Sequence, residues 1–344
     1  MRKLNVLVVF DSAGPPPADQ DYSDAFKEED WYTEAAVVET LREQGHEVGM
    51  LGIYDDVSLL IDAVRTRRPD IVFNLTEVFF GDPHMDKNIA CVLELLRVPF
   101  TGCGPVGQML CNNKALSKKV LNYHRIRTPR FEVFRIGRRV WLPKRLQLPL
   151  IVKPLTEEAS RGIAQASYVE DEARLRDRIR FIHEHLKSDA IAEEYVEGRE
   201  LYGSVLGVGR LRAFPLREMK FSAVPDEEPK LATYHAKWDE KYRKKWGIKS
   251  VFADDLPERQ AQTILHVCKR AYRMLNLDGY ARFDLRLTPD GLVYILEANA
   301  NPELAMGDEF AESAEKAGLD YDKLIRTIVA LGLRRTHNRA GPGR

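Results

Sequence analysis

Tyr280-Ala-Arg-Phe-Asp-Leu-Arg-Leu-Thr288 and Leu292-Val-Tyr-Ile-Leu-Glu-Ala-Asn299, separated by Pro289-Asp-Gly291, form the stretch that decides the fold. Both segments alternate between apolar and polar residues, which is typical of strands with one buried face, and Pro-Asp-Gly is typical of a tight turn. The stretch therefore predicts a β-hairpin. We expect two apolar rows to face the core, with Ala281, Phe283, Leu285 and Leu287 in the first strand and Leu292, Tyr294, Leu296 and Ala298 in the second.

The same alternation sends four polar side chains to the opposite face of the hairpin, namely Arg282, Asp284, Glu297 and Asn299. Mg²⁺ prefers oxygen ligands and usually binds through one or two carboxylates together with substrate phosphates. Asp284, Glu297 and Asn299 therefore suit two Mg²⁺ ions, or Mn²⁺, on a triphosphate. Arg282 would neutralise an anion that develops during the reaction. The alternative is a solvated, charged sheet face with an incidental ion pair.

The composition excludes several classes of protein. At 344 residues the chain is too long for a single core, so we expect two or three domains. It has 52 Lys and Arg residues and 52 Asp and Glu residues, so no overall field attracts nucleic acid or an anionic membrane. Four cysteines without a Cys-x-x-Cys pair favour reduced thiols. The apolar run Leu4–Phe10 ends without a cleavage site and no run approaches ~20 residues, which predicts a soluble, cytoplasmic protein.

Hydrophobic periodicity divides the chain into three units and a tail. Over residues 1–108, predicted strands at residues 4–10, 47–53, 70–75 and 98–101 alternate with helices, which predicts an α/β domain with a parallel sheet. Residues 109–198 predict a small α+β domain. Residues 199–334 predict a second α+β domain that contains the hairpin and ends in helices near residues 308–317 and 321–334. The last residues, 335–344, are rich in Arg and Gly and are predicted to be disordered.

Two segments suggest other functions. Gly102-Cys-Gly104-Pro-Val-Gly107 matches the Gly-x-Gly-x-x-Gly fingerprint, which would indicate a nicotinamide-dependent dehydrogenase. We reject this reading because the motif follows the last strand of its domain and because His124 and Arg125 stand about 20 residues later, where an acid is needed. A glycine-rich turn between domains explains it better. Residues 217–255 hold nine Lys or Arg residues with interleaved aromatic residues. Overall neutrality argues against nucleic-acid binding, and we predict a long connection without regular structure that covers an active site.

Further residues suit a nucleotide. Lys153 ends an apolar strand and precedes the loop 156–162, a combination that favours phosphate binding. Lys114, near the start of a predicted helix, is either a second phosphate ligand or simply solvated. Glu193 and Glu200 lie on the next strand and in the turn after it, where they can hydrogen-bond a base and a ribose. An acidic linker between domains is the alternative.

The order of these elements resembles the ATP-grasp superfamily and, within it, the D-alanine–D-alanine ligases. The similarity runs from about residue 4 to residue 334 and is most specific at Gly279-Tyr-Ala-Arg-Phe-Asp284 and Leu296-Glu-Ala-Asn299. It implies an ATP-grasp fold, with an N-terminal parallel-sheet (pre-ATP-grasp) domain and two α+β lobes that clasp ATP. It also implies roles for single residues: Lys114, Lys153, Ser160, Arg161 and Gly162 on the phosphates, Glu193, Glu194, Tyr195 and Val196 at the adenine, Glu200 at the ribose, Asp284, Glu297 and Asn299 on the metal ions, and Arg282, Lys237 and Ser160 as catalytic groups.

The resemblance implies a two-step ligation. A carboxylate attacks the γ-phosphate of ATP to give an acyl phosphate and ADP, and an amine then attacks the acyl phosphate. Protein groups mainly position the reactants and neutralise charge. The resemblance also implies small-molecule carboxylate and amine partners, amino acids among them, and it is compatible with a homodimer. The open alternative is a nucleotide-binding regulatory protein of the same fold without ligase turnover.

The departures from the family concern the substrates. The family has a short, glycine-rich first loop with an amine-binding Glu, whereas residues 11–30 contain three consecutive prolines and several acids, with Glu28 and Glu29 as approximate counterparts. The second substrate loop holds Asn74 and Glu77 but lacks the His-Gly-Arg-Gly-Glu pattern, and the segment after the hairpin lacks the Ser-rich part. We therefore expect substrates other than two D-alanines.

Overall fold

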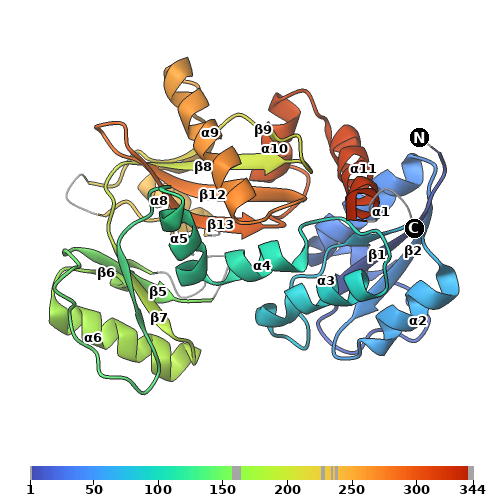
Figure 1. Ribbon diagram of the computed structural model, residues 1–344, viewed down its shortest axis with the longest axis horizontal. Coiled ribbons are helices and arrows are strands. Elements are labelled where there is room, and N and C mark those ends of the chain that lie inside the picture. The colour runs from blue at the N-terminus through green and yellow to red at the C-terminus, as the bar shows by residue number, and fades with distance from the viewer. Residues whose placement is uncertain (1, 157–163, 226–228, 234, 237–238, 340–344) are drawn as a thin grey trace.

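Three β-sheets organise the chain (Figure 1). The computed structural model describes residues 2–156, 164–225, 229–233, 235–236 and 239–339, without the side chains of residues 29 and 336–339. Each sheet falls within one of the three units that the sequence predicts. In Figure 1 the N-terminal domain lies on the right and the two lobes on the left. The helix α4 (Pro105–Asn112) lies between the N-terminal domain and the lobes, and α5 (Lys114–Tyr123) continues from it to the left, between the two lobes.

The N-terminal sheet is parallel, in the order β2-β1-β3, and its strands are almost wholly apolar because helices cover both of its faces. The predicted strand at residues 47–53 is confirmed, since β2 begins and ends at the predicted residues. The predicted strand at residues 98–101 is reduced to one parallel bridge between Val72 and Phe100. The elements are β1 (Asn5–Asp11), α1 (Tyr32–Glu43), β2 (Glu47–Ile53), α2 (Ser58–Arg67), β3 (Ile71–Asn74) and α3 (Asp86–Leu95), with 3₁₀ turns at Ala25–Lys27, Glu29–Trp31 and Pro83–Met85.

The glycine motif at residues 102–107 is a turn only in its first half. Gly104 precedes the first residue of α4, Pro105, whose fixed φ suits the start of a helix. The predicted turn is therefore wrong for residues 105–107. Gly107 lies inside α4, where an added Cβ would come within 3.1 Å of the Asn276 carbonyl oxygen, so this glycine serves close packing.

The central lobe is a four-stranded sheet in the order β4-β7-β5-β6, with all pairs antiparallel. A helix covers one face, and its apolar side chains Leu175 and Ile179 pack on Leu150 and Val152. The elements are β4 (Phe131–Phe134), β5 (Leu150–Pro154), β6 (Tyr168–Val169), α6 (Glu172–Phe181) and β7 (Ala190–Glu194), with a 3₁₀ turn at Gln165–Ser167 and a π-helical turn at Ile182–Leu186.

The C-terminal lobe is built on a sheet in the order β11-β10-β8-β12-β13, with β9 beside β8. The predicted structureless connection at residues 217–255 is wrong, since it contributes two strands and a helix. Met219 and Ile248 belong to a buried hydrophobic cluster, and the charged residues Arg217 and Glu218 beside Met219 are buried as well. The elements are β8 (Arg199–Leu206), β9 (Arg212–Ala213), β10 (Arg217–Phe221), α8 (Glu240–Trp246), β11 (Ile248–Phe252), α9 (Glu258–Met274), β12 (Tyr280–Leu287), β13 (Val293–Ala300) and α10 (Glu309–Lys316).

The last helix, α11 (Tyr321–Arg339), returns to the N-terminal domain and packs against α1 and β3 (Figure 1). Its residues Leu324 and Ile328 share a hydrophobic cluster with the N-terminal strands and with Phe310 of α10. The predicted disordered tail is wrong at its start, because residues 335–339 are helical. Arg335 is only 4% exposed and donates hydrogen bonds to the backbone carbonyl groups of residues 100 and 102, at 2.7 and 2.6 Å. The N-terminal domain and the C-terminal lobe therefore share one core.

The cysteines and the hydropathy of the helices are two further features of the structure. The four cysteines, at positions 91, 103, 111 and 268, are free thiols. Over the described residues, every helix is too short or too polar to cross a membrane.

Candidate active site

The β12–β13 hairpin brings the four predicted polar residues together on one face. Arg282 pairs with Asn299, and Asp284 pairs with Glu297, as direct cross-strand neighbours. Arg282 Nε donates to Asp284 Oδ1 at 2.9 Å, and Asn299 Nδ2 donates to the same oxygen at 3.1 Å. The predicted common face is confirmed, whereas the role of these residues as metal ligands remains a prediction.

A β-bulge makes this register fit the turn. The pairing shifts between Asp284 and Leu285, so that Leu285 faces Ile295 and Leu296 is the extra residue. Beyond the bulge the predicted apolar row holds, with Ala298 in the core. Between the bulge and the turn the prediction is wrong: Val293 and Ile295 are buried instead of Leu292, Tyr294 and Leu296. The three-residue turn exchanges the buried and exposed faces of residues 292–296 relative to the prediction. The extra residue of the bulge restores the predicted faces from Glu297 onward.

Three buried lysines face the hairpin. Lys114 Nζ lies 3.1 Å from Glu297 Oε1, and the side chain of Lys114 is only 3% exposed. Lys153 and Lys118 lie on either side of Glu193, each with its Nζ 3.3 Å from a different carboxylate oxygen. The three lysines and Arg282 are matched by four carboxylates, those of Glu193, Glu297, Asp284 and Glu309. The three lysines lie on α5 and β5, whereas Glu193 and Glu297 lie on β7 and β13. Metal-bound phosphates that bind between them would pair with the lysines, and the bound cations would pair with the carboxylates, so no buried charge would be left unmatched.

The pKa shifts follow from this crowding. Burial lowers the pKa of Lys118 to about 8, although the Glu193 carboxylate opposes that effect. Burial also acts against the charge of Lys153, but Glu193 and Glu297 outweigh it and raise the net pKa of this lysine. For Arg282, burial is outweighed in the same way by Asp284 and Glu309. Lys153 and Arg282 therefore stay cationic at neutral pH and provide fixed positive charge.

We call the part of the cleft beyond Lys153 the adenosine cavity, because the resemblance predicts that the adenosine binds there. Glu200 lines this cavity, accepts a hydrogen bond from Tyr202 at 3.2 Å and forms a 2.6 Å ion pair with Arg286. Tyr195 and Val196 line the cavity as well, whereas one carboxylate oxygen of Glu194 accepts a hydrogen bond from the backbone N–H of Gln147. Glu193 lines the cavity, and its carboxylate forms ion pairs with Lys118 and Lys153, so its role at the adenine remains a prediction.

This cleft is nearly closed. It holds about 80 Å³ of water-accessible space, below the roughly 300–1,000 Å³ of most ligand pockets. Glu297 lines this cleft and forms an ion pair with Lys114 at 3.1 Å. The predicted phosphate-loop residues Ser160, Arg161 and Gly162 and the predicted catalytic Lys237 lie outside the described residues.

A larger cavity of about 440 Å³ adjoins the hairpin between the N-terminal domain and the C-terminal lobe. Its walls include Asn74 and Glu77, as predicted for substrate residues. Glu28 is exposed and does not line the cavity, so its predicted substrate contact is not supported by its position, and the Glu29 side chain lies outside the described residues. The acids that do line the cavity in this part of the chain are Asp11, Asp30 and Glu34.

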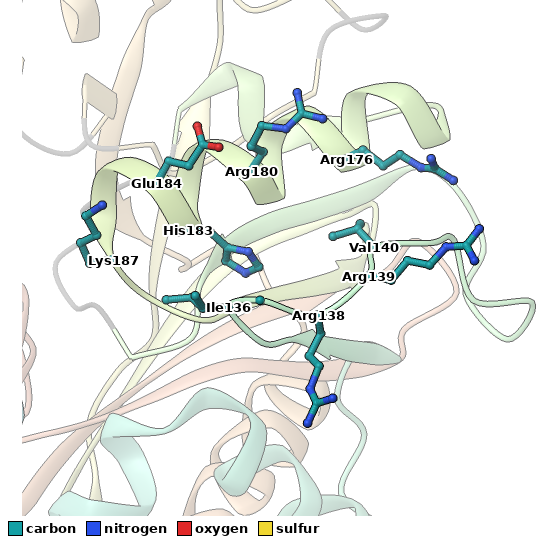
Figure 2. Close-up of a pocket in the computed structure, with 10 residues that line it drawn as sticks. Ile136, Arg138, Arg139, Val140, Arg176, Arg180, His183, Glu184 and Lys187 are labelled. Carbon is teal, nitrogen blue, oxygen red and sulfur yellow. The ribbon is translucent and has the colours of Figure 1, made fainter.

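Another cavity, of about 530 Å³, lies away from the hairpin on the central lobe, between the turn at residues 136–140 and α6 (Figure 2). Most of its charged lining residues are basic, and in Figure 2 Arg138 points away from Arg176 and Arg180. None of the predicted site residues that the structure describes lines this cavity. We therefore place the active site at the hairpin.

Sequence reasoning missed several residues of the site. Lys118 follows Lys114 by four positions on a predicted helix, so the two share a face, and this spacing was an available signal. Arg286 follows Arg282 and Asp284 in the same alternation on β12. Glu309 had no such signal, because tertiary packing alone brings it within 3.4 Å of Arg282.

The hairpin residues fit a divalent cation on a nucleotide. Among the described residues no cluster holds three or more His, Cys, Asp or Glu side chains suited to a metal ion. Two carboxylates and one amide, from Asp284, Glu297 and Asn299, are the ligand set that Mg²⁺ uses when substrate phosphates and water complete its coordination. Because Asn299 donates through Nδ2, its Oδ1 is the atom left for a metal ion.

Comparisons with known proteins agree with the fold. The family model described as D-ala D-ala ligase C-terminus matches residues 119–330. The uncharacterized protein y4sG of Sinorhizobium fredii is 30% identical over 307 residues, which cover 87% of each chain. A D-alanine–D-alanine ligase of Bordetella avium is 30% identical over 303 residues, covering 86% of this chain and 87% of the relative. The crystal structure of the Bacillus anthracis D-alanine–D-alanine ligase complexed with ATP superposes with a TM-score of 0.74 at 20% identity, covering 98% of this chain and 99% of the other.

The fold is thus that of an ATP-grasp ligase, an enzyme class that forms a carbon–nitrogen bond and releases ADP and phosphate. This chain belongs to the D-alanine–D-alanine ligase family. The predicted resemblance and fold class are confirmed.

Proposed function

We propose that this protein joins a small carboxylic acid to a small amine, amino acids among them, through an acyl phosphate, and that its substrates differ from two D-alanines. One observation carries the proposal. Arg282, Asp284, Glu297 and Asn299 share one sheet face, and buried lysines face them across a narrow cleft. That arrangement suits the transfer of a γ-phosphate to a carboxylate, in which positioning and charge neutralisation supply most of the catalysis.

The residues of the site have separate roles in binding the phosphates and the metal ions. Lys114 and Lys153 bind the phosphates, and Asp284, Glu297 and Asn299 hold two Mg²⁺ or Mn²⁺ ions. Bound there, the metal ions neutralise charge on the β- and γ-phosphates. The donor carboxylate oxygen attacks the γ-phosphorus, the bond to the β,γ-bridging oxygen breaks, and ADP leaves. The amine then attacks the acyl carbon, inorganic phosphate leaves, and the amine loses a proton.

Arg282 stabilises the oxyanion of the tetrahedral intermediate in the second step. Burial together with Asp284 and Glu309 fixes its guanidinium, so little reorganisation is needed when the anion forms. Removal of one such donor typically costs about 3–4 kcal/mol of barrier.

The test is ADP release by the pure protein with Mg²⁺, ATP and a panel of amino-acid pairs. Turnover with at least one pair other than two D-alanines supports the proposal. Nucleotide binding without turnover for any pair contradicts it and favours a regulatory protein of the same fold. Efficient ligation of two D-alanines alone would overturn the proposed change of substrate.

A further inference from the structure

The 440 Å³ cavity lies directly next to the catalytic hairpin. Tyr280 and Asn301 line it, and they stand two residues from Arg282 and Asn299 on the same two strands or just beyond them. A strand rises about 3.3 Å per residue, so the cavity begins roughly 7 Å from the reacting groups. A substrate that fills this cavity can therefore reach the γ-phosphate site.

The wall of this cavity is packed rather than loose. Trp31 lines it and packs edge-on against Phe10, with ring centroids 5.5 Å apart. Tyr22, which is only 4% exposed, packs on the same ring at 4.8 Å. The segment at residues 11–31 is thus anchored to the core, and the carboxylates that it carries are held at fixed positions.

The lining is acidic. Five carboxylates reach the cavity from separate segments of the chain, namely Asp11, Asp30, Glu34, Glu77 and Glu303. Among the described residues none of the side chains that line it is basic. Glu303 accepts a hydrogen bond from Thr33 at 2.5 Å, and Asp11 accepts from the backbone N–H of Glu77 at 2.7 Å. Those donors are neutral and leave the negative charge in place.

The excess of negative charge raises the pKa values of individual carboxyl groups. Burial, and then the carboxylates of Glu303 and Asp11, raise the pKa of Glu34 to about 7. Burial, and then the carboxylate of Glu303, raise the pKa of Asp308 to about 6, although Asp308 itself does not line the cavity. In the part of the chain that the structure describes, no ion pair joins Asp11, Glu34 or Glu303 to a basic side chain.

An unused donor also points to a ligand. Asn74 is 3% exposed and lines the cavity. Its Oδ1 accepts from the hydroxyl of Thr76 at 2.8 Å and from the backbone N–H of the same residue at 3.4 Å, which identifies that atom as the oxygen. The Nδ2 group makes no hydrogen bond to any described residue. Because Asn74 lines the cavity, this amide group can donate a hydrogen bond to an oxygen of a bound substrate.

We propose that the substrate bound in this cavity carries two positively charged amino groups and an acceptor oxygen, as a basic amino acid does. The oxygen accepts from Asn74, one amino group lies among the carboxylates of the N-terminal domain, and the second pairs with Glu303. This inference rests on the proposed ligase function and adds the charge class of one substrate.

The test compares lysine with norleucine, which has the same carbon chain without the ε-amine. ADP release is measured with each compound, supplied with a common second substrate, for the wild-type protein and for the variants Glu303→Gln and Asn74→Ala. We expect lysine to be preferred by at least 10-fold in kcat/KM, through KM. Glu303→Gln should reduce this lysine-to-norleucine ratio by at least fivefold, whereas Asn74→Ala should weaken both compounds alike.

A matched control is Glu315→Gln, an exposed position on α10 outside the cavity, which should leave the ratio unchanged. Equal use of lysine and norleucine, or an unchanged ratio in Glu303→Gln, would overturn the inference while the ligase function stands. If no pair supports ADP release, the ligase proposal fails instead. Calorimetric titration of lysine and norleucine into the protein then decides the charge preference on its own.

Discussion

The ion pair between Arg286 and Glu200 should be essential for both the stability of the C-terminal lobe and the shape of the adenosine cavity. The two side chains are 4% and 5% exposed, and their charged atoms lie 2.6 Å apart. Arg286 also donates to the carbonyl oxygens of Gly198 and Lys230, at 2.7 and 2.5 Å. Replacement by methionine keeps most of the side-chain volume but leaves Glu200 charged and buried. Breaking a buried pair in this way costs about 3–5 kcal/mol.

Urea unfolding followed by far-UV circular dichroism measures that cost. The control is Arg326→Met, which removes an ion pair with Asp322 at 3.0 Å whose side chains are 47% and 48% exposed. An exposed pair is worth 0.2–1 kcal/mol, so the control should change the free energy of unfolding by less than about 1 kcal/mol. The double variant Glu200→Gln/Arg286→Met should recover at least about 1 kcal/mol, because no unpaired charge remains.

Two results would refute this reasoning. One is an Arg286→Met variant that loses no more stability than Arg326→Met. The other is a double variant that is less stable than Arg286→Met alone, since that would show that Glu200 is not a buried charge in need of a partner. Binding of ATP, measured by calorimetry, should weaken in both Arg286 variants because the pair forms part of the cavity wall.

Three further outcomes follow from the site. Glu297→Gln should lower Mg²⁺-dependent ADP release by at least about 100-fold with little change in the urea midpoint, and normal turnover would contradict the metal assignment. Lys153→Met should weaken ATP binding at least about 10-fold by calorimetry, and unchanged affinity would remove this lysine from the phosphate site. The pKa of Glu34 is raised to about 7 by burial and then by Glu303 and Asp11, so the folded protein binds the extra proton and stability should fall as pH rises from about 4.5 to 7. Urea midpoints at pH 5 and pH 8 should therefore differ less in Glu34→Gln than in the wild type.

Local patterns were sufficient to predict most of the fold. The strand at residues 47–53 has the predicted bounds because Gly45 ends the helix before it and apolar residues fill the strand. The charged segment 217–255 was missed because charged residues occupy buried positions in it. Arg217 and Glu218 are buried in β10 next to Met219, so no alternation of apolar and polar residues marks this strand. The helix α11 was predicted as a helix, but its packing against the N-terminal sheet is a tertiary contact with no local signal.

Some residues of the site could likewise be predicted from local patterns, and others could not. Residues on a single hairpin, such as Asp284 and Glu297, could be grouped because strand alternation relates them. The acidic cavity could not be predicted, because Asp11, Glu34 and Glu303 are brought together only when the N-terminal domain and the C-terminal lobe share one core. No periodicity connects residues almost three hundred positions apart.

The bulge at Leu296 shows how closely fold and chemistry are linked in this protein. The three-residue turn alone would place Glu297 on the face opposite to Asp284, and one extra residue restores the common face. The backbone carbonyl of that extra residue accepts a hydrogen bond from the Lys118 ammonium group, and its side chain lines the adenosine cavity. The irregularity that aligns the two carboxylates therefore also holds a lysine beside Glu193. A straight hairpin with the same residues would lose both arrangements, so the bulge is part of the active site rather than an imperfection in the sheet.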